Sequence, residues 1–170
     1  MMRWWPYVFL VAILVTVSSV VGAAQQASTE RLDIERSSAN QGDADAQFNM
    51  ARRYFGGRGV APHIGLSIFW YEAAADQDHV LAQADLAYIY ASGLGGVQRD
   101  LVQGYMWFTI SAARSAGRQK EQAIRTRETF SGDMTPDQIA EAQRLARGWD
   151  EAHPRNDPPL VPVERPTSQR

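Results

Sequence analysis

Residues 46–60 read AQFNMARRYFGGRGV and residues 82–97 read AQADLAYIYASGLGGV, and these stretches decide the fold because they are copies of one pattern. The copies align at a shift of 36 residues until Gly96, an additional residue in the second copy, moves the shift to 37. The matching positions are Ala46 and Ala82, Ala51 and Ala87, Tyr54 and Tyr90, Gly57 and Gly93, Gly59 and Gly95, and Trp70 and Trp107. A period of this length indicates stacked supersecondary units that cannot bury their apolar faces alone, so we interpret the matching residues as structural.

Each copy predicts two helices separated by a glycine-rich turn. In the first copy, Ala46, Met50 and Tyr54 recur at helical spacing on one face. Either Asp43 or Asp45 supplies a suitable N-cap before them.

The turn residues predict where each helix ends and the next begins. Gly57 ends the first helix of its unit, and Pro62 is predicted to lie in the first turn of the following helix. In the second copy, Asp78 and Asp100 are the predicted N-caps of the two helices, and Gly117 is the predicted end of the second one.

Further helices flank the two copies. Residues 28–41 predict one short helix that caps the N-terminal side, and residues 118–130 predict the first helix of a degenerate third unit. Thr135 as N-cap, Pro136 at N1 and Gln138 at N3 predict a capping box at the start of the last helix. The whole pattern predicts an all-α fold, an α/α superhelix (solenoid) of two full helix-turn-helix repeats between capping helices.

The N-terminus has the pattern of a secretory signal peptide. Arg3 gives a positive start, residues 7–17 form an apolar run, and small residues end the segment at Ala24. The alternative is an uncleaved membrane anchor, which leaves the domain on the same side of the membrane. We therefore expect a periplasmic or secreted protein that contacts a membrane only through this segment.

These observations divide the chain into six parts. They are a signal peptide or anchor (1–24), a capping helix (25–42), repeat 1 (43–77), repeat 2 (78–113), a degenerate third repeat with a C-terminal capping helix (114–152), and a proline-rich tail expected to be disordered (153–170).

The repeated motif also has a family resemblance. The pattern Ala-Gln-x-x-Leu/Met-Ala-x-x-Tyr, then Gly-x-Gly, then Trp and a small pair ending in Ala, resembles the Sel1-like repeat over residues 39–112. That repeat is a relative of the tetratricopeptide repeat, and the resemblance implies an adaptor or scaffold without catalytic residues. His63 and Asp78 depart from the pattern, since an acidic residue and a glycine usually stand there. The secreted branch in which β-lactam binding or hydrolysis has been discussed carries disulfides, and this chain has no cysteine.

The sequence gives little support to metal, cofactor or nucleic-acid binding. The formal net charge of -2 lacks the basic footprint of a nucleic-acid binder. His63, His79 and His153 are the only histidines, and their spacing matches no metal-binding helix motif. No G-x-S-x-G or G-K-[ST] motif is present. We therefore expect no metal, no cofactor and no catalytic residues, although a catalytic triad assembled in space stays open.

A basic run lies between the second copy and the last helix. Its members are Arg114, Arg118, Lys120, Arg125 and Arg127, with Glu121 and Glu128 among them. An anionic lipid, peptidoglycan or acidic protein is one possible ligand. Helical pairing of opposite charges favours the alternative, a solvated helix face.

Four residues of the copies fall outside the repeated stripe and are the candidate partner-binding residues. They are Phe48, Arg52, Phe55 and Tyr88. Aromatic and arginine side chains are favoured anchors at interfaces, so we predict that these four line a groove. The alternative is packing against the capping segments.

The sequence thus predicts a non-enzymatic protein-protein interaction module of the bacterial cell envelope or periplasm, which binds a peptide or partner protein in a superhelical groove. It is expected to be a monomer. One alternative is a hydrolase acting on the cell wall or on β-lactams, and another is a structural subunit of an envelope complex.

Overall fold

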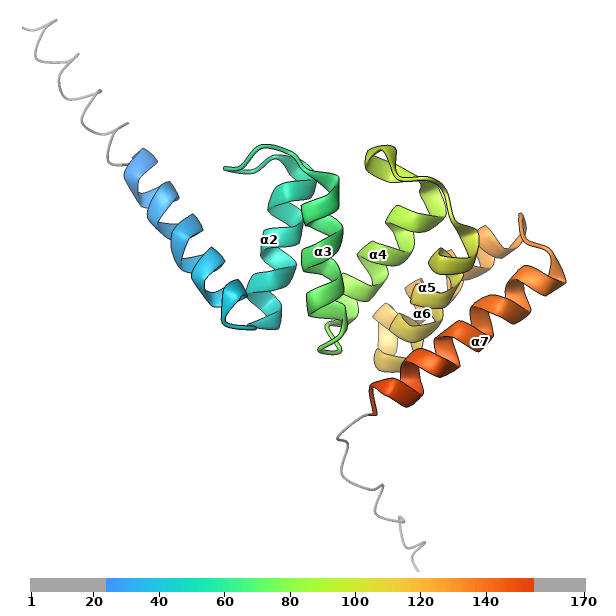
Figure 1. The fold of residues 1–170 in the computed structure, drawn as a ribbon. Helices are drawn as coiled ribbons and strands as arrows, with labels where there is room; N and C mark the ends of the chain where they lie inside the picture. Colours follow the sequence, from blue (N-terminus) through green and yellow to red (C-terminus); the bar gives the residue numbers. More distant parts are fainter. Residues whose placement is uncertain (1–23, 155–170) are drawn as a thin grey trace, which may run out of the picture.

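The computed structural model describes residues 24–154, which form helices and contain no strand (Figure 1). A first helix, residues 24–40, is followed by α2 (Ala44–Gly56), α3 (Ile64–Ala75), α4 (Val80–Ser92), the 3-10 turn η1 (Leu94–Gly96), α5 (Leu101–Arg114), α6 (Gly117–Ser131) and α7 (Pro136–Ala152). The predicted all-α fold is confirmed. Nearly all of the predicted signal peptide and proline-rich tail lie outside the described residues. Within residues 24–154, every helix is too short or too polar to cross a membrane.

The two copies form two equivalent helical pairs, α2 with α3 and α4 with α5 (Figure 1). Gly57 and Gly93 occupy the same place at the ends of α2 and α4, with left-handed φ values of 66° and 69°. A Cβ at Gly57 would lie 2.8 Å from the Pro62 ring, so both the turn conformation and the space require glycine here.

A repeated hydrogen bond joins each unit to the helix before it. Gln47 Nε2 donates to the Ala39 carbonyl at 3.2 Å, and Gln83 Nε2 donates to the Ala75 carbonyl at 3.1 Å. Both glutamines are buried, and each gives a second hydrogen bond to a helix-end carbonyl that also accepts from a turn amide, that of Gly42 or Asp78. The repeat in the sequence is therefore a repeat of contacts.

The predicted helix starts at Asp43 and Asp100 are correct. Asp43 Oδ1 accepts a hydrogen bond from the Ala46 amide at the start of α2. Asp100 Oδ1 accepts one from the Gln103 amide at the start of α5.

The predicted role of Asp78 as an N-cap is wrong. Its φ of 62° is left-handed, as is that of Gly42 at the equivalent place in the preceding unit, because the turn needs this conformation. An N-cap needs extended backbone. His79 therefore caps α4, and its Nδ1 accepts a hydrogen bond from the Ala82 amide at 3.1 Å.

The start of α3 also differs from the prediction, which placed Pro62 in the first turn of this helix. The helix begins at Ile64, after Pro62, and His63 is its N-cap, with Nδ1 accepting from the Leu66 amide at 3.1 Å. The end of α5 also lies earlier than predicted, at Arg114, and Gly117 begins α6.

Two hydrophobic clusters hold the helices together. The smaller one joins the first helix to α2 through Leu32, Ala39, Ala46 and Met50. The larger one includes Phe48, Tyr71, Leu86, Ile89, Met106, Trp107, Phe108, Ile110 and Ala146, from α2, α3, α4, α5 and α7. The first helix thus caps one end of the stack, as predicted.

The last two helices close the other end. Thr135 and Gln138 form the predicted capping box at the start of α7. Helix α7 packs on α5, where the rings of Trp107 and Trp149 meet edge to face at 5.7 Å between centroids. Helix α6 packs on the same α5.

Candidate partner-binding groove

Two hollows lie between the first helices of the successive units, α2, α4 and α6. The α2–α4 hollow has a volume of about 290 Å³, and its lining includes Arg52, Phe55, Arg58, Asp85, Tyr88 and Leu94. The α4–α6 hollow, of about 260 Å³, is lined by Leu81, Asp85, Tyr88, Phe108, Gln119 and Gln122 among others. Asp85 and Tyr88 border both hollows, so we treat the two together as one groove.

The structure brings three of the four predicted partner-binding residues into one hollow. Arg52, Phe55 and Tyr88 come from two helices and line the α2–α4 hollow. Phe55 is 41% exposed and Tyr88 is 49% exposed, although both are large aromatic side chains. Their exposure leaves an apolar surface on neighbouring helices that a ligand could cover.

Phe48 does not line the groove, which corrects the prediction for this residue. It is buried, with its ring 4.4 Å from that of His79 and 5.9 Å from that of Tyr71. The guanidinium carbon of Arg52 lies 5.6 Å from the centre of the Phe48 ring. The Phe48 ring therefore makes a cation–π contact with the guanidinium of Arg52.

Asp85 and Tyr71 also line the groove, although neither was predicted from the sequence as a partner-binding residue. Both side chains line the α2–α4 hollow, and burial raises the pKa of the Asp85 carboxyl, against the smaller lowering effects of the neighbouring Tyr71, Arg52 and His79. Burial and the nearby Asp85 also raise the pKa of Tyr71. One signal was present in the sequence, since Asp85 is the only charged residue in α4.

Several arginines gather at the α2 end of the groove. Arg53 forms an ion pair with Glu35 of the first helix and also donates to the Arg58 carbonyl. Arg52 and Arg58 have no carboxylate within ion-pairing distance among residues 24–154. Two cationic side chains are thus available beside Phe55.

The repeated positions contribute to packing and turns rather than to the groove. The alanines at 46, 51, 82 and 87 are buried, and so is Trp107. Tyr90 donates to Glu72 at 3.3 Å, and burial raises the pKa of Tyr90 to about 12.

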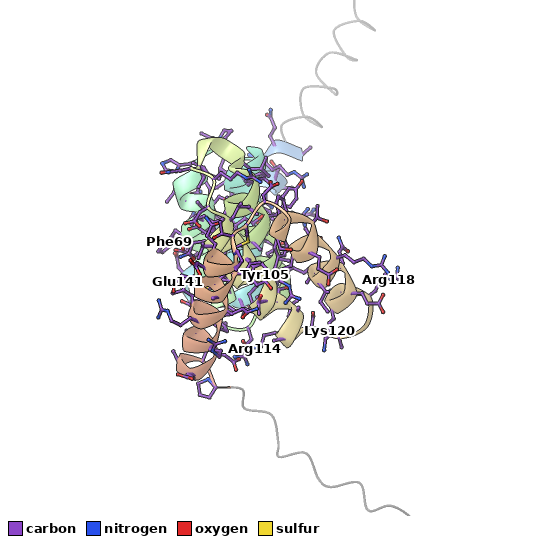
Figure 2. All side chains as sticks on the ribbon, turned by 90° about the vertical axis from the view of Figure 1, so that its right-hand side faces the viewer. Phe69, Tyr105, Arg114, Arg118, Lys120 and Glu141 are labelled. Carbon is purple, nitrogen blue, oxygen red and sulfur yellow. The ribbon has the colours of Figure 1, made fainter. Side chains whose placement is uncertain are left out.

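The basic run is not one solvated face. Arg118 and Lys120 extend from α6 away from the other helices, whereas Arg114 lies against α7 (Figure 2). The Arg114 side chain is only 2% exposed, and Arg127 lies 5.2 Å from the ring of Tyr105. The interpretation as a solvated face is therefore wrong for Arg114, which the fold uses internally.

The histidines have structural contacts. His63 and His79 cap helices, and the His153 ring stacks on Trp149 at 4.1 Å. Within the described residues, no three side chains of the metal-binding types come together.

Comparison with known proteins identifies the repeat. The model of the Sel1 repeat family matches residues 44–79 and residues 80–115. A search of curated protein sequences gave no match.

Two solved structures are similar to the chain. One is a protective antigen present in uropathogenic Escherichia coli strains that displays an SLR fold, with 29% identity, a TM-score of 0.65, and coverage of 72% of this chain and 25% of that one. The other is a Sel1 repeat protein from Oxalobacter formigenes, with 29% identity, a TM-score of 0.53, and coverage of 71% of this chain and 86% of that one. The chain therefore spans a quarter of the length of the Escherichia coli structure.

Proposed function

Because residues 44–115 match two Sel1 repeats, we propose that the chain is a non-enzymatic adaptor or scaffold that binds a peptide or a partner protein in the groove between α2, α4 and α6. Sel1 repeat proteins are generally protein-interaction modules. The observation that carries the assignment to this groove is the pair of exposed aromatic side chains, Phe55 and Tyr88, at residues that differ from the repeated pattern.

The physical basis is a rigid frame that carries variable residues. Buried alanines and hydrogen-bonded glutamines fix the helices, so little backbone freedom is lost when a ligand binds. Aromatic side chains supply large contact areas with few rotatable bonds, and hence they are efficient anchors for a partner. Phe55 and Tyr88 are aromatic, and each lies on a helix that the repeated contacts hold in place. Both the backbone and the side chain therefore lose little freedom on binding.

We further propose that the module acts in the periplasm or cell envelope. Support for this comes from the N-terminal sequence, in which Arg3 precedes an apolar run over residues 7–17 and small residues end the segment. Fractionation of cells into cytoplasm, periplasm and membranes, followed by detection of the protein, tests the location. Recovery in the cytoplasm alone would contradict it.

Affinity capture tests the groove itself. The purified protein and the Phe55→Ala/Tyr88→Ala variant are used as baits in periplasmic and membrane extracts, and captured proteins are identified by mass spectrometry. Phe69→Ala is the control, because Phe69 is 56% exposed on α3 and lies outside both hollows. We expect the double variant to lose the specific partner and the control to keep it, with helical content and melting temperature unchanged in both.

Two outcomes would overturn the proposal. Equal capture by the double variant and the wild type would show that the partner does not bind in the groove. Loss of folding in the double variant would show that Phe55 and Tyr88 are core residues. Turnover of a chromogenic β-lactam or of muropeptides by the pure protein would show that it is a hydrolase and not an adaptor.

A further inference from the structure

We propose that the α2–α4 hollow is specific for an extended partner segment in which an acidic side chain stands next to a large apolar one, with Arg52 and Arg58 binding the carboxylate. This inference rests on the proposed function and adds the chemistry of the partner to it. It is carried by the charges, the exposed apolar side chains and the course of the groove.

The first step is the positive charge at the α2 end of the hollow. Arg52 and Arg58 both line it, and neither pairs with a carboxylate within residues 24–154. The neighbouring Arg53 is already neutralised by Glu35, so the surplus charge belongs to the two residues that face the hollow. The whole chain has a formal net charge of -2, and hence this cationic character is local.

The second step is the state of the one carboxyl group in the same hollow. Asp85 lines the hollow together with Tyr71, and burial raises the pKa of its carboxyl. The Asp85 carboxyl also lies beyond ion-pairing distance of Arg52 and Arg58, so it leaves both arginine side chains open to a carboxylate from a ligand. A carboxylate brought by a ligand would form the charge-assisted hydrogen bonds that the free arginine side chains lack in residues 24–154.

The third step is the apolar surface next to the arginines. Phe55, Tyr88 and Leu94 are 41%, 49% and 36% exposed, and all three line the hollow with Arg52 and Arg58. Burial of such side chains by an apolar ligand group is favourable at roughly 25 cal/mol per Å² of apolar area. The geometry thus places a site for an apolar side chain beside a site for a carboxylate.

The carboxylate of the ligand could belong to an acidic side chain within the bound segment or to the C-terminus of the partner chain. Asp85 and Tyr88 line both hollows, so the α4–α6 hollow adjoins the α2–α4 hollow and offers a bound chain a continuation past the arginines. Gln119 and Gln122 of α6 line this continuation with amide groups that can bond a peptide backbone. We therefore assign the carboxylate to an Asp or Glu side chain within an extended segment.

The experiment is a selection of random peptides on the immobilised full-length protein, followed by affinity measurements on selected peptides by fluorescence anisotropy. The wild type is compared with Arg52→Gln/Arg58→Gln and with Phe55→Ala/Tyr88→Ala. The control is Arg125→Gln/Arg144→Gln, which removes the same net charge from exposed residues outside both hollows. Each selected peptide is also made with its acidic residue replaced by the neutral amide.

We expect the wild type and the control to enrich Asp or Glu next to a large apolar residue. The Arg52→Gln/Arg58→Gln variant should bind the same peptides at least about tenfold more weakly, and the amide peptides should show a similar loss on the wild type. The Phe55→Ala/Tyr88→Ala variant should lose the preference for the apolar neighbour.

The outcomes separate the two proposals. Enrichment of peptides without acidic residues, or equal affinity of acidic and amide peptides, would overturn this inference and leave the proposed groove function intact. Absence of any enrichment would overturn both, because a peptide-binding groove must select some peptide.

Discussion

The guanidinium of Arg114 pairs with the carboxylate of Asp78, one full unit earlier in the chain, and donates from Nη1 to Oδ2 at 3.4 Å. Its Nη2 also lies 2.7 Å from Asp150 of α7 and donates to the His153 carbonyl at 2.6 Å. The same side chain lies 5.3 Å from the centre of the Trp149 ring. One buried arginine thus ties the turn between α3 and α4 to the C-terminal end of α7.

Substituting Arg114 by alanine should therefore destabilise the protein. Removing one partner of a buried ion pair costs about 3 to 5 kcal/mol, and we expect about 2 to 3 kcal/mol here because Asp78 and Asp150 are half exposed and stay hydrated. Urea unfolding followed by circular dichroism gives the free energy of unfolding. Arg144→Ala is the matched control, since Arg144 pairs with Glu141 on the exposed side of α7 and its loss should leave the melting temperature unchanged. Equal effects of the two substitutions would contradict the role of Arg114.

Two helical glycines should respond to alanine with opposite signs. A Cβ at Gly104 would lie 2.6 Å from the Ala91 Cβ and within 3.0 Å of the Ala91 backbone, so α4 and α5 could not keep their present approach. We expect Gly104→Ala to cost about 1 to 3 kcal/mol through overpacking. Gly148 of α7 has nothing within 4 Å of its Cβ position, so Gly148→Ala should stabilise by about 0.5 to 1 kcal/mol through helix propensity. Thermal melting of both variants checks the signs, and a stable Gly104→Ala protein would show that the two helices can move apart.

The repeated residues made most of the fold predictable. Matching glycines and tyrosines gave the helix-turn-helix units because each has one dominant conformational or packing use at its place. Thr135, Pro136 and Gln138 gave the start of α7 for the same reason, since a capping box is decided by neighbours in the chain.

The errors arose where one residue type has several uses. Aspartate serves both as an N-cap and in left-handed turns, and only the turn geometry shows that Asp78 has the second use. Arg114 belongs to a basic run by spacing, but the docking of α7 decides that it is buried. Phe48 and Phe55 lie seven residues apart on one helix, and the position of His79 and Tyr71 decides which of them is covered.

Removal of α7 should unfold or aggregate the protein. Residues 136–149 contain Ala142 and Ala146, which are buried, and Trp149, which covers Trp107 of α5. Their loss would expose core side chains on a stack that has only two full repeats, where about three are needed for stability. A truncated protein that stays soluble and melts cooperatively would contradict this prediction.

A paired substitution tests the same interface without truncation. Ala142→Asp puts a carboxylate at a fully buried position and should cost several kcal/mol, whereas Ala140→Asp on the exposed side of α7 should be nearly neutral. Size-exclusion chromatography and thermal melting distinguish the two. Similar behaviour of both variants would mean that α7 does not cover the core in solution.

Because the pKa of Asp85 is raised, we predict that replacing Asp85 by asparagine increases the melting temperature by an amount that depends on pH. Burial holds this pKa above the ordinary value of 3.8, so the folded state favours the protonated carboxyl more than the unfolded state does. The resulting stabilisation is complete below pH 3.8 and is lost as the pH rises through the folded-state pKa. An asparagine side chain at this position would have nearly the same size and would never carry a charge, so Asp85→Asn should melt at a higher temperature than the wild type near neutral pH. The difference should shrink as the pH is lowered and vanish once the wild-type carboxyl is protonated in both states. Melting temperatures across this pH range check the prediction, and a difference that is constant with pH would show that the carboxyl is not desolvated in the folded protein.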